Sequence, residues 1–131
     1  MKLTKYNRNR LLQTFETWRV PKDFAEPMFN YLVYGFEPGS CFTSVLANDF
    51  HGAIRWSHPA NTVEAFKALA GWIFDTVPAE ARGSYKSVDD WIKLTPELRR
   101  EILERHNLIY TEEEEVMLIL RNQYTTEPAL Y

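Results

Sequence analysis

Several polar residues that could carry chemistry lie close together between positions 48 and 61. Asn48, Asp49, His51 and Arg55 interrupt a run of apolar residues that recur at helical spacing. A charge within an apolar stripe is costly unless it is paired or hydrogen-bonded. In one interpretation the helix breaks near Asn48-Asp49 and these side chains cap the neighbouring backbone, which is a usual role of Asn and Asp. In the other, Asp49 lines a polar pocket with Asn48, His51, Arg55 or Asn61. We favour the capping interpretation.

A second candidate site is the turn Pro38-Gly39-Ser40, which precedes that run. The N-terminus of a helix offers free N–H groups and the positive end of its dipole, and these can hold a phosphate or carboxylate. The turn lacks the spacing of a P-loop or of a dinucleotide-binding motif. A simple capped turn is therefore the favoured interpretation, and a small anionic ligand or nucleotide bound by Gly39-Ser40 and Asn48-Asp49 is the alternative.

No complete catalytic set is visible in the sequence. Cys41 and His51 have the residue types of a thiol nucleophile and its general base, but ten residues along one helix would separate them by about 15 Å. The three histidines and the single cysteine do not have the spacing of metal ligands. We therefore expect neither a metal nor a cofactor, and we expect binding rather than catalysis.

Composition restricts the class of protein further. Of 131 residues, 45% are hydrophobic, 25% are charged and 15% are aromatic, which is typical of a globular chain rich in rings. A net charge of −3 makes a nucleic-acid partner an unfavoured interpretation. A single cysteine suits a reducing compartment, and neither a signal peptide nor a membrane-spanning run is visible. The sequence predicts a cytoplasmic protein.

Helical patterns cover most of the chain. They predict an all-α fold, with one compact domain of five to six short helices over 1–131. The strongest segments are 23–34, 39–54, 62–76, 95–107 and 111–123. We expect 39–54 to be continuous if it runs past Gly52, and 62–76 to be the central helix. The segments within 95–123 form a C-terminal helical pair, and 124–131 is a loose tail.

The apolar faces of three segments are predicted from the spacing of their residues. On helix 62–76, Val63 and Phe74 share the apolar stripe and Trp72 lies nearly opposite. On helix 95–107, Leu98, Ile102 and His106 face one way. The segment 116–120 is apolar all round, so it is buried on several sides, covered by a partner, or a short strand.

Aromatic residues are also more frequent than a core of this size needs. Trp18, Trp56, Trp72 and Trp91 accompany seven tyrosines. Trp and Tyr are favoured at interface hot spots, so the rings either build the core or mark an interface.

One part of the chain resembles a known group of proteins. The stretches Gly35–Phe42 and Val45–Phe50, followed by Asn61, Gly83-Ser84 and Trp91, resemble small bacteriophage-encoded proteins. Their pattern is G-[IF]-x-P-G-S-F-L, then V-L-x-N-D, a later Asn, and G-S…W. The resemblance covers about 27–93, and Cys41-Phe42 stands where Phe-Leu is commoner.

The resemblance implies a phage accessory protein, without a catalytic activity to transfer. For such proteins, binding to a host factor, including a host-defence component, is a common role. We expect a host protein as partner in the host cytosol, no membrane, and leave a homo-oligomer open. The candidate partner- or ligand-binding residues are Gly39, Ser40, Asn48, Asp49, His51, Arg55, Trp56, Asn61 and Trp72.

Overall fold

The computed structural model describes residues 2–123, and every regular element in that part of the chain is helical. Eight α-helices and two short 3₁₀ helices follow one another: α1 (Lys5–Trp18), η1 (Lys22–Phe24), α2 (Ala25–Tyr34), α3 (Ser40–Leu46), α4 (Phe50–Trp56), α5 (Val63–Thr76), η2 (Ala79–Ala81), α6 (Tyr85–Lys93), α7 (Pro96–Arg105) and α8 (Glu112–Gln123). The all-α class is confirmed, but the predicted number of helices is too low. The tail predicted at 124–131 lies outside the described residues.

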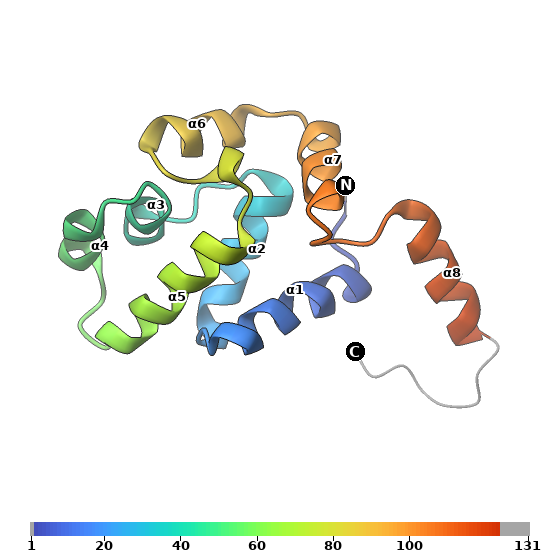
Figure 1. Cartoon of the computed structure of the whole chain (residues 1–131), viewed down its shortest axis with the longest axis horizontal. Coiled ribbons are helices and arrows are strands. Elements are labelled where there is room, and N and C mark those ends of the chain that lie inside the picture. Colours follow the sequence, from blue (N-terminus) through green and yellow to red (C-terminus); the bar gives the residue numbers. More distant parts are fainter. Residues whose placement is uncertain (1, 124–131) are drawn as a thin grey trace.

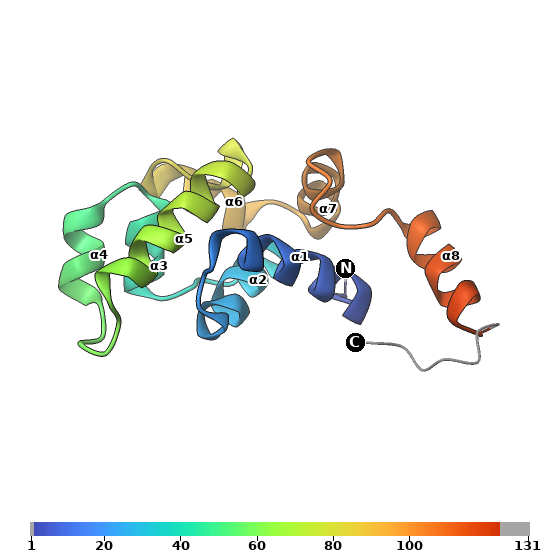
Figure 2. The same cartoon turned by 60° about the horizontal axis from the view of Figure 1, so that its bottom comes forward.

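Helix α2 is the most deeply buried element of the fold. Six of its ten residues are buried, against three of fourteen in α5. It packs against both α1 and α7, and α4 and α8 lie at opposite ends of the molecule (Figures 1 and 2). The prediction that 62–76 is the central helix is therefore wrong, because α2 rather than α5 is enclosed on several sides.

Trp72 belongs to the core that joins α1, α2 and α5. Its side chain is 0% exposed, its ring lies 4.8 Å from the Phe15 ring, and Phe15 lies 5.0 Å from Phe29. The Trp72 indole N–H donates to the Thr14 hydroxyl at 2.8 Å, so its polar atom is satisfied inside the protein. The prediction of Trp72 as a binding residue is wrong, since packing against Phe15 removes it from the surface.

The rest of α5 corrects the predicted apolar stripe. Val63 is 79% exposed and Phe74 is 77% exposed, whereas Leu69, Trp72 and Ile73 are buried. This helix has apolar residues around most of its circumference, so packing against α1 decides which of them are covered.

The predicted helix 39–54 is interrupted, and Asp49 lies at the interruption. α3 ends at Leu46, Asn48 adopts a left-handed conformation with φ 63°, and α4 begins at Phe50. The Asp49 carboxylate accepts the backbone N–H of Gly52 at 2.9 Å, as an N-cap does. The capping interpretation of Asp49 is confirmed, and the continuous helix is wrong.

Most of the other predicted helix ends are confirmed. Thr62, Thr95 and Thr111 each accept a backbone N–H from three residues further along the chain. The sequence predicted the start of the next helix at Ser87, which is wrong by one turn: the cap of α6 is Ser84, which accepts the N–H of Ser87 at 3.0 Å. The local signals therefore place the helix starts to within a few residues.

Helix α8 lies at one end of the molecule beside the start of α1 (Figure 1). Its inner side is polar: the Asn7 amide donates to Glu115 at 3.1 Å, and the Asn122 amide donates to the Tyr6 hydroxyl at 2.7 Å. The segment 116–120 is helical and most of its side chains are exposed, Met117 by 67%. It is therefore neither a strand nor buried on several sides.

Gly39, just before α3, needs a conformation that other residues rarely adopt. Its φ is +92°, and a Cβ placed there would meet no atom within 4 Å. We expect Gly39→Val to lower the free energy of unfolding by about 1 kcal/mol or more, because of backbone strain and not because of a collision. Thermal and chemical denaturation measure it beside Ser40→Val, the next residue. Equal stability of wild type and Gly39→Val would show that this backbone relaxes freely.

Candidate functional site

The structure separates the predicted site residues: some line one of two surface depressions, Trp72 lies in the core, and Asp49, His51, Arg55 and Asn61 line neither depression. The first depression, the Gly39 hollow, lies between the start of α3, the end of α4 and the start of α6, and encloses about 360 Å³. It is lined by Glu37, Gly39, Ser40, Thr43, Ser44, Trp56 and Tyr85. Three predicted residues, Gly39, Ser40 and Trp56, thus line the same hollow.

Asp49 adjoins this hollow through a hydrogen-bonded chain. The Tyr85 hydroxyl donates to the Asp49 carboxylate at 2.5 Å, and the Ser44 hydroxyl lies 3.1 Å from the same Tyr85 oxygen. The hydrogen bond from Tyr85, then that from the Gly52 N–H, and the nearby His51 lower the pKa of Asp49. The carboxylate of Asp49 is therefore already held by donors from its own chain.

Tyr85, Ser44 and Gly52 were not predicted as members of this site. A Cβ on Gly52 would lie 2.5 Å from the Asp49 carboxylate and 3.0 Å from the Ser44 hydroxyl. A glycine inside a helical pattern costs stability relative to alanine, so Gly52 was an irregularity of the sequence, although its type alone does not point to Asp49. Tyr85 is 36 residues from Asp49, and nothing in the sequence links them.

The single polar pocket of the second interpretation is not formed. His51 and Arg55 are exposed on α4, and the Arg55 guanidinium lies 5.2 Å from the Trp56 ring. Asn61 belongs to a turn in which its N–H donates to the His58 carbonyl at 2.9 Å. Asn48 lines a different depression, which is described next. The chain changes direction at the break between α3 and α4, so these residues do not lie along one continuous helical face.

The second depression, the α4–α5 cleft, encloses about 340 Å³. It is lined by Val45, Leu46, Asn48, Phe50, Ala70, Ile73, Phe74, Arg82 and Gly83. Phe50 and Phe74 remain exposed although both are large apolar side chains. Aliphatic walls and two exposed rings give a site for apolar side chains.

Arg82 is the one charged residue among the described residues that line this cleft. Its side chain donates to the Val77 carbonyl at 3.0 Å and to the Phe74 carbonyl at 3.3 Å. Its guanidinium also lies 5.2 Å from the Phe74 ring. These contacts use part of the five donors of Arg and hold a positive charge at the edge of an apolar surface.

Residues 2–123 contain no group of three or more His, Cys, Asp or Glu arranged to hold a metal ion. The Cys41 thiol donates to the Ala53 carbonyl at 3.4 Å, and burial raises the pKa of that thiol, which disfavours a thiolate. Within the same residues, no helix has the length and apolar character needed to cross a bilayer.

Comparisons of the chain with protein-family models, with curated proteins and with solved structures found no match.

The lowered pKa of Asp49 predicts a pH-dependent contribution to stability. A carboxylate whose pKa is lower in the folded state contributes stability above its unfolded pKa and loses it as the pH falls through the folded value. We expect Asp49→Asn to be less stable than wild type at neutral pH, and the difference to shrink in strong acid. Urea denaturation across this range measures it.

Asp23→Asn is the matched control, because Asp23 is exposed on η1. A constant difference between Asp49→Asn and wild type at every pH would contradict the ionised cap.

Proposed function

We propose that this protein acts by binding another protein in the α4–α5 cleft. The observation that carries the proposal is the exposure of Phe50 and Phe74 beside a cleft with aliphatic walls. Ile54, one helical turn after Phe50 on α4, is exposed as well and extends the same surface. Aromatic anchors next to a pocket are the usual centre of a protein interface, and exposed apolar patches often mark such sites.

The chemistry of the cleft defines the partner that would fit it. A volume of about 340 Å³ suits an apolar side chain or two from a helix or loop of the partner. Arg82 keeps donors that can form a charge-assisted hydrogen bond with a carboxylate. We infer a partner segment that carries apolar residues next to an Asp or Glu.

The resemblance to phage accessory proteins suggests which protein the partner is. Its range of about 27–93 includes α3, α4, α5 and the segment Arg82-Gly83, which together build the cleft. We propose a host protein in the host cytosol, with a host-defence component as the leading case, whose activity the protein modulates by occupying its surface.

Selection from a display library of random peptides tests the cleft directly. We expect selected peptides to combine an apolar residue with an acidic one, and Phe74→Ser to weaken their binding at least tenfold. Arg82→Ala should weaken acidic peptides more than their amide versions, because only the former use its charge. The test of the host role then uses a host protein that carries such a segment, in purified form.

Val63→Ser is the matched control, because Val63 is as exposed as Phe74 on the same helix and does not line the cleft. Peptides that bind Phe74→Ser as tightly as wild type would exclude the cleft as the binding site.

The Gly39 hollow supports a second candidate, the binding of a small ligand. Trp56 and Tyr85 present exposed rings on which a planar ligand can stack. Glu37 is the one charged residue among the described residues that line the hollow. The carboxylate of Asp49 adjoins the hollow through its hydrogen bond from Tyr85. This charge disfavours the predicted anionic ligand and favours an uncharged nucleoside. Tryptophan fluorescence and thermal shift with nucleosides and nucleotides test it, beside Trp56→Ala.

A further inference from the structure

Helix α8 presents an apolar surface to solvent at its centre. Val116, Met117, Ile119 and Leu120 are exposed by 52, 67, 42 and 41%. The opposite side of the helix is held by polar contacts, with Glu115 buried against α1 and α7. The helix is thus fixed in place by one side and uncovered on the other, which is unusual for a sequence so apolar.

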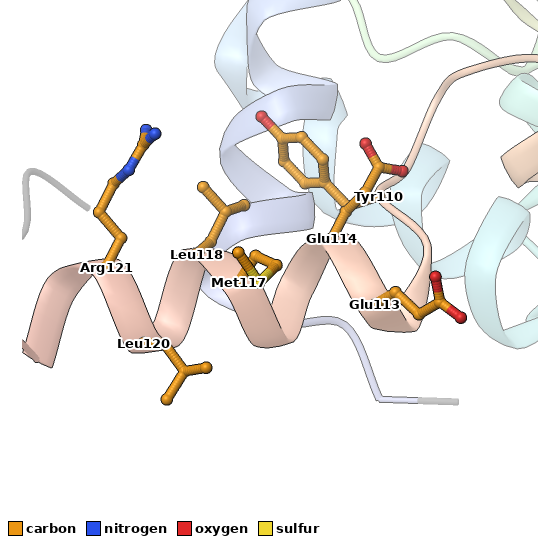
Figure 3. A pocket seen from close by; sticks show the side chains of 7 residues that line it. All are labelled: Tyr110, Glu113, Glu114, Met117, Leu118, Leu120 and Arg121. Atoms are coloured by element: carbon orange, nitrogen blue, oxygen red, sulfur yellow. The ribbon is translucent and has the colours of Figure 1, made fainter.

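Charged residues flank this apolar centre in a particular order. Glu113, Met117 and Arg121 are four residues apart, so they follow one another along one stripe of α8 (Figure 3). All three line a hollow of about 530 Å³ on this helix. Along this stripe an acidic residue is followed by the apolar Met117 and then by a basic residue.

This order is self-complementary under a twofold rotation. If a second α8 lies antiparallel across the first with the axis at Met117, Glu113 of each copy faces Arg121 of the other. The apolar centres then meet each other, and the two helix dipoles are antiparallel. A parallel pair would instead bring the acidic first turns, 112–114, together, which like charges oppose.

We propose that the occupant of this surface is a second copy of the chain, packed through α8 as an antiparallel pair. Closed twofold dimers of this kind are the commonest oligomers, and they require one patch that complements itself.

The size of the contact predicts a weak dimer. A helix of twelve residues is about 18 Å long. A pair of such helices with its flanking charges buries less than the roughly 1,600 Å² of a standard interface. We therefore expect a monomer–dimer equilibrium that shifts over micromolar concentrations and weakens at high salt.

Sedimentation velocity of the full chain over a hundredfold range of concentration tests the proposal. We expect dimers at the upper end, and at least a tenfold rise in the dissociation constant for Leu120→Glu. Val63→Glu, which introduces the same charge at an exposed apolar position of α5, should leave the constant unchanged. Circular dichroism confirms that each variant is folded.

Charge exchange provides a second test that does not depend on Leu120. Glu113→Lys and Arg121→Glu alone should each weaken the dimer several-fold, and the double variant should recover most of the loss, because each pair is restored with reversed sign. A chain that stays monomeric at every concentration would overturn the proposal and leave a different protein as the occupant. A dimer unaffected by Leu120→Glu, or not restored by the double exchange, would overturn it as well.

Discussion

Replacing Arg99 by methionine is expected to lower the free energy of unfolding by about 3 kcal/mol or more. The guanidinium is buried, and it donates to four backbone carbonyls, those of Val33, Tyr34, Ile92 and Leu94. These carbonyls lie at or next to the C-terminal ends of α2 and α6. The last carbonyls of a helix have no N–H donor within that helix, and a positive charge there interacts favourably with the helix dipole. Methionine fills similar volume but donates nothing, so buried acceptors lose their partner.

Chemical denaturation of Arg99→Met beside Arg99→Lys and Arg105→Ala measures this effect. Lysine keeps the charge without the planar fork, so an intermediate loss is expected. Arg105 forms an exposed ion pair with Glu80 at 2.9 Å, and its removal should cost less than about 1 kcal/mol. A loss for Arg99→Met as small as that for Arg105→Ala would contradict the structural role of the four hydrogen bonds from Arg99.

The change Asn7→Asp is expected to lower the free energy of unfolding by about 2 kcal/mol at neutral pH. Asn7 is fully buried, accepts the N–H of Tyr110 at 2.7 Å and donates to the Glu115 carboxylate at 3.1 Å. Aspartate keeps the acceptor but replaces the donor with a second carboxylate facing Glu115. As the pH falls, one of the two takes a proton and can donate to the other, so part of the loss is recovered.

Hydrogen exchange locates this effect within the fold. Because Asn7 joins α1 to the segment that carries α8, the amides of α8 should lose protection before those of α2. Asn9→Asp on the same helix is the control, since Asn9 is not buried. A uniform loss of protection across α2 and α8 would show that α8 opens only with the whole fold.

The predicted helices succeeded where the signal was local. The caps at Thr62, Thr95 and Thr111 and the left-handed Gly35 after α2 depend on hydrogen bonds between residues three or four apart. The capping role of Asp49 is of the same kind, because its acceptor geometry involves Gly52 in the next turn.

The candidate site was predicted less completely, because its walls come from distant parts of the chain. Gly39, Ser40 and Trp56 meet in one hollow, but Tyr85 joins them from α6. Phe74 was assigned to the apolar stripe of helix 62–76, and it lines the α4–α5 cleft with most of its side chain exposed. The periodicity of an apolar helix says that a stripe exists and not which neighbour covers it.

By itself, the sequence determined that the described chain is helical and where most helices begin, and it favoured the capping interpretation of Asp49. The tertiary structure alone decided that Trp72 is fully buried while Trp56 is 57% exposed. It also decided that on α7 Arg99, and not Leu98, faces the interior of the protein. The physical reason is the range of the interactions. Helix caps form between neighbours in the chain, whereas burial depends on packing between helices, which joins Trp72 to Thr14 across 58 residues and Arg99 to Val33 across 66.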